Sequence, residues 1–341
     1  MDNERSTSIG WTARVRVVGA IAAAAALVAL LVVAFAGSGT KVAPRDLPLA
    51  VTGGEQAAGA VSARLQSQVP GGFTVVAVAD TAGAEALIRD RAVYGALVTR
   101  GPAVAEVLVA SAAAPAVAQV LTGLAGQLEG VAVRDVVAAP RDDPRGAGLA
   151  GGALPITIGG ILTGALAALL VSRTSARVGV VVTSSLTMGA VLVAVLHGVF
   201  GSLVGNPWVE WAAASSGVGA IGLVIIGAYA LGGRAALVGI DLVLIMVGNP
   251  FSAATSAPEL LPQPWGAIGH WMPLGSTVDL LRGISGFGGA GTRGPWLALA
   301  AWAGLGAMLF GVAGIRRVRD PALGAAAVEG RALPLDAPVA P

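Results

Sequence analysis

The chain has 341 residues, of which 55% are hydrophobic and only 12% are charged. Because soluble domains average about a quarter charged residues, this composition indicates burial in a lipid bilayer. There is no cysteine, which excludes disulfides and thiolate chemistry. Every cation except Lys41 is an arginine, and no basic face is long enough to follow a phosphate backbone, so we expect no nucleic-acid partner.

Long apolar runs predict six membrane-spanning helices, because a hydrocarbon core of about 30 Å needs about 20 apolar residues of helix. The predicted spans are residues 17–37, 153–171, 178–201, 211–231, 235–253 and 296–315. The five spans after the first form one transmembrane region, 153–315. The expected fold is therefore an α-helical polytopic membrane protein.

Arginines near the span ends predict the orientation of the chain, because cytoplasmic loops are enriched in Lys and Arg. Four arginine groups fall on one side of a six-span chain, whereas the opposite short loop, 202–210, has no cation. The groups are Arg5, Arg14 and Arg16; Arg173 and Arg177; Arg234; and Arg316, Arg317 and Arg319. We expect a multi-pass plasma-membrane protein with a cytoplasmic N-terminus, 1–16, and a disordered cytoplasmic tail, 316–341.

The first span has an alternative interpretation. Ala34-Phe35-Ala36 is an A-x-A pattern after basic residues, as in a cleaved signal peptide. The apolar stretch of 17–37 is longer than the 7–15 residues usual for such a peptide, which favours an uncleaved anchor. Cleavage would leave the other five spans oriented as before.

Residues 38–152 are predicted to form a small α/β domain between the first and second spans, facing away from the cytoplasm. About half of the chain's charged residues lie there, so this stretch must be in water. Short apolar runs alternate with helical spacing. Strands are predicted at 49–52, 73–79, 94–99, 106–110 and 131–137, and helices at 55–68, 84–91 and 115–128. The domain has no His or Cys, and Asp142-Asp143 is interpreted as a solvated linker. We expect no enzyme activity, cofactor or metal.

Asp241 is the only ionisable residue well inside a predicted span. A carboxylate at that depth costs about 2.5–3.5 kcal/mol on insertion scales, so it should face protein or water. It is either part of a substrate or proton path, or a structural residue that is protonated or paired with Arg234.

The segment near 257–287 is too polar and too rich in proline to span, yet its two tryptophans sit among apolar neighbours. We predict two short helices dipping into the outer leaflet as a re-entrant hairpin, the second over Leu274–Ile284. Asp279 and Arg282 lie one turn apart on it, and His270 precedes them. These three residues and Asp241 are the candidate transport or gating residues. The alternative to such a hairpin is an interfacial loop that only braces the bundle.

The order of features resembles the permease of a type-2 ABC exporter, and more narrowly the actinobacterial phage-infection-protein (YhgE/Pip-like) group. The resemblance covers nearly the whole chain. The segments that carry it are Asp46–Val51, Tyr94–Val98, Asp143–Gly146, Asn249–Phe251, Ala257–Pro262, Trp265-Gly266, Gly269–Pro273 and Leu281-Arg282.

The resemblance implies a dimeric permease-like subunit, a homodimer or a heterodimer, that moves a hydrophobic or cell-envelope molecule outward. A separate ABC ATPase would supply the energy, because the only lysine, Lys41, lies outside any Gly-Lys-Ser/Thr phosphate-binding loop. The alternative is a non-transporting envelope receptor or assembly scaffold that binds a partner through its outer domain.

Overall fold

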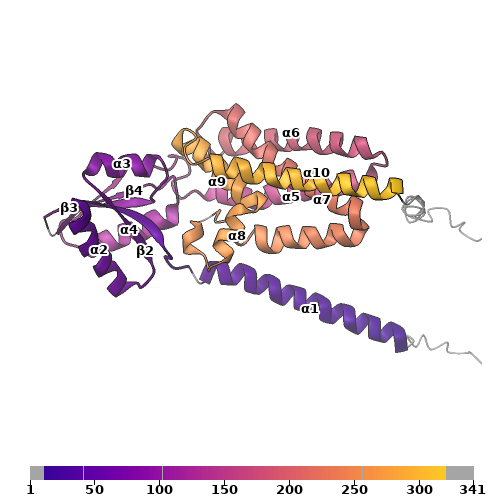
Figure 1. The fold of residues 1–341 in the computed structure, drawn as a ribbon, viewed down its shortest axis with the longest axis horizontal. Coiled ribbons are helices and arrows are strands. Elements are labelled where there is room, and N and C mark those ends of the chain that lie inside the picture. The colour runs from indigo at the N-terminus through magenta and orange to yellow at the C-terminus, as the bar shows by residue number, and fades with distance from the viewer. Residues whose placement is uncertain (1–10, 41, 102, 255, 320–341) are drawn as a thin grey trace, which may run out of the picture.

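The structure is a computed structural model that describes residues 11–40, 42–101, 103–254 and 256–319. An α/β domain sits at one end of a bundle of long helices, and α1 runs beside the bundle at an angle (Figure 1). We call the end that carries the domain the domain end, and the other the far end. The elements in chain order are α1 (Trp11–Thr40), β1 (Leu47–Thr52), α2 (Gly54–Gln68), β2 (Phe73–Val78), α3 (Thr81–Arg89), β3 (Gly95–Arg100), β4 (Ala103–Val109), α4 (Pro115–Ala125), β5 (Ala132–Asp135), α5 (Ala147–Leu170), α6 (Thr174–Gly198), α7 (Pro207–Val243), the π-helix η1 (Leu244–Gly248), the 3₁₀ helix η2 (Pro258–Leu260), α8 (Trp265–Trp271), α9 (Pro273–Phe287) and α10 (Arg293–Arg319).

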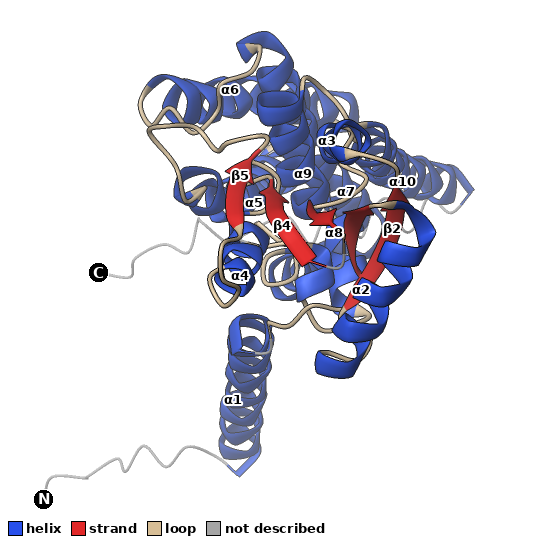
Figure 2. Ribbon diagram, turned by 90° about the vertical axis from the view of Figure 1, so that its left-hand side faces the viewer, coloured by secondary structure: helices blue, strands red, loops and turns tan. Residues whose placement is uncertain are grey.

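The α/β domain is built on a five-stranded sheet with the order β2-β1-β3-β4-β5 (Figure 2). All neighbouring strands are parallel except β3 and β4, which form an antiparallel pair. The elements coincide with the strands and helices predicted for 38–152, with ends that differ by no more than three residues. Alternating apolar strands and amphipathic helices therefore fold here as the sequence pattern predicts.

Both faces of the sheet contribute to the attachment of the domain to the bundle. On one face, α2 and α4 pack over β1, β2 and β4, and this core includes Ala257 and Leu260 from the loop around η2. On the other face, α3 packs over β1, β3 and β4, and Phe287 at the end of α9 joins that core. The sheet is therefore held between two parts of the same segment, 257–287.

Helix α7 is the centre of the bundle and packs against α5, α6 and α10. Glycines permit close approach of the backbones: an added Cβ at Gly160 would lie 2.6 Å from Ile221, and one at Gly164 would lie 2.7 Å from Ile225. Small residues of this kind let helices pack in lipid, where no hydrophobic force drives them together. Among the described residues, five helices are long and apolar enough to cross a membrane: α1, α5, α6, α7 with η1, and α10.

The apolar stretch Pro207–Gly248 is 42 residues long, which as a straight helix would measure about 63 Å, twice the hydrocarbon core. It is broken at Gly232 and Gly233, whose backbone angles are not helical. Gly233 has a φ of +64°, a conformation that favours glycine. After the break the chain returns to the domain end, because η1 packs against α8 and α9. The predicted fourth and fifth spans are the two segments on either side of this break.

Helices α8 and α9 form a hairpin that enters the bundle from the domain end. The predicted helix Leu274–Ile284 is present as the middle of α9, which is buried along most of its length between α7 and α10. An added Cβ at Gly217 of α7 would lie 2.1 Å from Thr277 Oγ1, so the two backbones are in close contact. Gly217 lies ten residues after Pro207, which places the contact about 15 Å along α7, or half the hydrocarbon thickness.

The start of α1, the loop between α5 and α6 with the first turn of α6, and the last turn of α10 lie at the far end of the bundle, away from the α/β domain (Figure 1), and the described arginines of the first, second and fourth groups belong to these segments. Arg177 differs from the prediction of a loop residue: it lies in the first turn of α6, is 1% exposed, and sits 5.2 Å from the centre of the Tyr229 ring. Residues 11–16, predicted as part of the N-terminal segment, already belong to α1. Residues 1–10 and the predicted tail after Arg319 lie outside the described residues.

Candidate functional site

A cavity of about 350 Å³ lies where the α/β domain meets the hairpin α8–α9. We call it the polar cavity, because ionisable and hydroxyl groups line much of it. Three of the four candidates from the sequence meet there: His270, Asp279 and Arg282. The remaining polar residues are Arg91, Tyr94, Ser252, Glu259 and Gln263. The hairpin therefore forms one wall of the polar cavity, besides packing against the bundle.

Arg91 of the α/β domain forms an ion pair with Asp279 of α9 across the polar cavity. The side chains are only 12% and 16% exposed, so water screens the pair less than a surface pair. The Arg91 guanidinium also lies 5.4 Å from the centre of the Phe287 ring, within range of a cation–π contact. One domain side chain thus contacts both the middle and the end of α9.

The backbone of Arg91 has a φ of +60°, in the left-handed region that non-glycine residues seldom adopt. This residue follows the C-cap of α3, a position where helices often end with a left-handed glycine. An arginine costs roughly 1–2 kcal/mol there. The contacts to Asp279 and Phe287 offset that cost, because the left-handed turn aims the side chain at the hairpin.

Tyr94 links the domain to the loop before α8 by donating its hydroxyl to Glu259 Oε2 at 2.8 Å. Burial and the negative charge of Glu259 raise the pKa of the Tyr94 hydroxyl well above its usual range. Nearby, the N–H of Arg45 donates to the Glu259 carbonyl at 2.9 Å and the N–H of Ala43 to the Leu260 carbonyl at 3.1 Å. The segment that leads into β1 and the loop around η2 are therefore hydrogen-bonded together.

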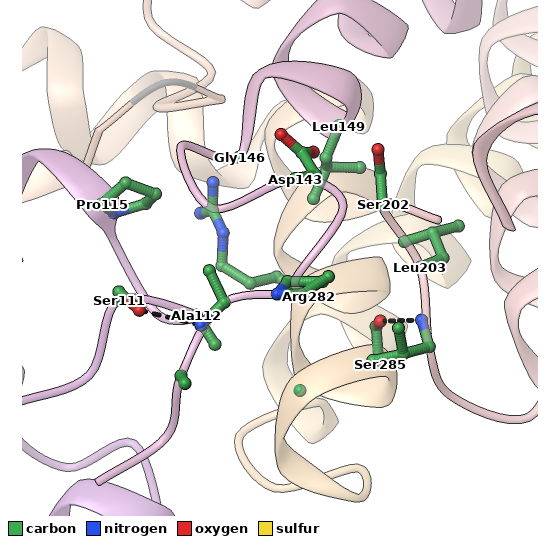
Figure 3. A pocket seen from close by; sticks show the side chains of 15 residues that line it. Ser111, Ala112, Pro115, Asp143, Gly146, Leu149, Ser202, Leu203, Arg282 and Ser285 are labelled. Carbon is green, nitrogen blue, oxygen red and sulfur yellow. Dashed lines mark hydrogen bonds between the residues drawn. The ribbon is translucent and has the colours of Figure 1, made fainter. Parts of the chain in front are cut away.

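Arg282 lies on α9 between the polar cavity and a smaller cavity of about 50 Å³, and it lines both. In Figure 3 its guanidinium reaches from α9 toward Gly146 and away from Ser285. It donates to the Ala254 carbonyl at 2.9 Å, and the described residues include no ion pair to it. Arg282 is a buried cation whose charge is not matched by an ion pair.

Asp143 is buried, which corrects its interpretation as a solvated linker residue. Its carboxylate accepts from the N–H of Ala147 at 2.7 Å and from the N–H of Gly148 at 2.9 Å. It therefore satisfies free donors at the start of α5 and complements the positive end of that helix. Asp143 fixes the point where the α/β domain rejoins the bundle.

Asp241 lies apart from the other three candidates, in the segment of α7 that returns after the glycine break. Its Oδ1 atom is buried and has no hydrogen-bond partner among the described residues. The pairing with Arg234 considered from the sequence is absent, because Arg234 is exposed and no described ion pair joins the two. An unpartnered carboxylate in this region is expensive, so Asp241 stays a candidate for function.

A second polar pair, His197 with Glu210, joins α6 to α7 at the domain end. Glu210 is fully buried, and its Oε2 lies 2.7 Å from His197 Nδ1. Its Oε1 accepts from the N–H of Gly205 at 2.8 Å. Glu210 was overlooked because it lies next to a predicted span end, where an acidic residue usually faces water. The pair anchors the loop that contacts the last turn of α9.

Within the part of the chain that the structure describes, no group of three or more His, Asp or Glu side chains is placed to hold a metal ion. Searches against family models, curated proteins and solved structures found no match to this chain. The polar cavity and the elements that enclose it are therefore the features from which function is inferred.

Proposed function

We propose that this chain is a transporter of the membrane, the permease-like subunit of an exporter that moves a hydrophobic or cell-envelope molecule outward. One observation carries the proposal: the polar cavity lies between the hairpin α8–α9, which is inserted in the bundle, and the α/β domain, which packs against that hairpin. Discontinuous helices that meet a polar cavity within an apolar bundle are typical of transport sites.

The proposal includes six crossings of the membrane. The segment before Gly233 has the length of a crossing, whereas the helical residues after it, 234–248, are fewer than the about 20 that a straight crossing needs. The second segment nevertheless reaches the domain end, where η1 contacts α8 and α9. With both termini in the cytoplasm, the arginines at the far end face the cytoplasm and the α/β domain lies outside. The polar cavity then opens at the outer surface, where an exported molecule would leave.

In this mechanism the α/β domain controls the exit. The ion pair of Arg91 with Asp279 and the hydrogen bond of Tyr94 with Glu259 hold the domain against the hairpin. Breaking both links would separate the two walls of the cavity. The energy for export would come from a separate ATPase, as the family resemblance implies, acting on a homodimer or heterodimer of such subunits.

A cross-linking experiment tests whether the α/β domain must separate from the hairpin for export. The chain has no native cysteine, so a pair introduced as Arg91→Cys and Asp279→Cys is the only reactive pair. Everted membrane vesicles from cells that express the protein take up the hydrophobic dye rhodamine 6G if the chain exports it. We expect uptake above that of vesicles without the protein, and its loss when a short bis-maleimide joins the two cysteines.

The matched control is a cysteine pair inside the α/β domain, Glu85→Cys with Arg134→Cys, which replaces an exposed ion pair. The same reagent should leave uptake unchanged there. Uptake equal to that of vesicles without the protein would contradict a transport function for this probe, and an intact fold in that case would favour the receptor or scaffold. Uptake that survives the first cross-link would contradict the exit mechanism.

A further inference from the structure

A second cavity, of about 370 Å³, adjoins the polar cavity and has no charged residue in its wall. We call it the apolar cavity. It lies between the end of α1, the start of α5 and the loop 249–261, with Phe35, Ala150 and Leu154 among its lining residues. Ser252 and Ala253 line both cavities, so the two cavities meet at these small side chains.

The apolar cavity faces the region where lipid would be. Along α1 the large apolar side chains are exposed: Val28 is 58%, Val33 70% and Phe35 44% exposed. The helix contacts the rest of the chain near its end, where Ala34 packs on Phe251 and its neighbours. Figure 1 shows α1 diverging from the bundle away from this contact. An acyl chain from the bilayer could therefore reach the apolar cavity beside α1.

The polar cavity carries both signs of charge in separate places. Arg91 and Asp279 neutralise each other as an ion pair. Arg282 has no ion pair among the described residues, and neither has Glu259, whose side chain accepts from Tyr94. The cavity therefore has one guanidinium for an anion and one carboxylate for a cation, a pattern that complements a zwitterion.

We propose that the two cavities together bind one zwitterionic amphiphile of the phospholipid class, with a phosphate at Arg282, a primary ammonium at Glu259 and an acyl chain in the apolar cavity. Each cavity alone has the size of a small-molecule site, which runs from about 300 to 1,000 Å³. The apolar cavity lies where α1 ends and α5 begins, which is the level at which headgroups would meet acyl chains if these helices span the bilayer. The proposal rests on the proposed function and names its substrate class.

Equilibrium binding to the purified full-length protein tests the site without a transport measurement. Isothermal titration would compare dihexanoyl phosphatidylethanolamine, dihexanoyl phosphatidylglycerol and phosphoethanolamine. We expect the first to bind most tightly, because the second lacks the ammonium and the third lacks the chains. Binding here with no transport of any probe would contradict the proposed function alone, whereas transport without binding would contradict this inference alone.

Variants separate the three contacts. Arg282→Gln should weaken binding of both lipids about 10–100-fold, as expected for loss of charge-assisted hydrogen bonds to phosphate. Glu259→Gln keeps an acceptor for Tyr94, and it should lower the affinity for phosphatidylethanolamine to that for phosphatidylglycerol. If Arg282→Gln fails to fold, Glu259→Gln still tests the zwitterion site.

Filling the apolar cavity tests the acyl chain. Ala150→Leu should weaken both lipids and leave phosphoethanolamine unchanged. The matched control is Gly151→Leu on the same helix, where an added Cβ meets nothing within 4 Å. Phosphoethanolamine that binds as tightly as the lipid would overturn the acyl-chain site. Equal affinity for the two lipids in the unmodified protein, with no effect of Glu259→Gln, would overturn the zwitterion site.

Discussion

The ion pair between Arg91 and Asp279 should hold the α/β domain on the hairpin, and its contribution can be worked out from its burial. Breaking a fully buried pair costs about 3–5 kcal/mol, whereas an exposed pair is worth about 0.2–1 kcal/mol. With side chains 12% and 16% exposed, this pair lies between the two limits, and we expect about 2 kcal/mol. The equilibrium for separating the domain from the hairpin should then rise about 30-fold on Asp279→Asn.

Hydrogen exchange followed by mass spectrometry measures that opening in the full-length protein. Amides that are exposed only when the domain separates should exchange about 30-fold faster, above all in the loop before β3 and in the last turn of α9. A double-mutant cycle of Arg91→Gln and Asp279→Asn isolates the pair from the effect of each substitution. We expect a coupling free energy of about 1–3 kcal/mol.

The control cycle uses Arg134→Gln and Glu106→Gln, an ion pair inside the domain with side chains 44% and 26% exposed. Its coupling should stay below about 1 kcal/mol, since both groups are well solvated. If the cycle at Arg91 gives no more than this control, or if exchange in the two reporter segments is unchanged, the pair does not hold the domain.

Four further outcomes are expected. Gly217→Ala should destabilise the bundle by about 1–3 kcal/mol in thermal unfolding, because its Cβ would overlap a threonine of α9, whereas Gly179→Ala, with nothing within 4 Å, should have little effect. A reporter fused after Arg316 should read cytoplasmic and one in the β3–β4 turn external, and the reverse at either point would refute the topology. Asp241→Asn should leave insertion and folding intact. If Asp241 serves transport, dye uptake should fall while the expression level stays the same. Unchanged uptake would make Asp241 a structural residue. Absorbance at 295 nm should show the Tyr94 hydroxyl ionising later than an ordinary tyrosine, since its pKa is raised, and Tyr94→Phe should remove that late phase. The raised pKa means that the folded state holds this proton longer than the unfolded chain does, so the associated stability should be lost only as the pH rises above about 10.

The hydrophobic runs alone indicate a helical membrane protein, and the described residues agree with this, since they include five helices that are apolar and long enough to span. Local patterns also predicted the strands and helices of 38–152 to within three residues, and the helix Leu274–Ile284. These features follow from side-chain periodicity and from turn residues, which act over a few positions of the chain.

Local sequence patterns could not predict contacts between residues that lie far apart in the sequence. Arg91 and Asp279 are 188 residues apart, and no periodicity connects an arginine after a domain helix with an aspartate on a hairpin. The sequence placed Asp279, Arg282 and His270 in one segment, but not the domain groups Arg91 and Tyr94 that complete their cavity.

The reversal of the chain after Gly233 also depended on tertiary packing, although the apolar segments on both sides of it were predicted from the sequence. Hydropathy marked both segments as apolar, yet whether a glycine pair merely bends a helix or reverses it depends on what the second segment packs against. Here η1 contacts α8 and α9, which are themselves held by the α/β domain, so packing at the domain end selects the reversal. Residue types determined which segments leave water, whereas the complementary surfaces of distant segments decided where charged groups meet.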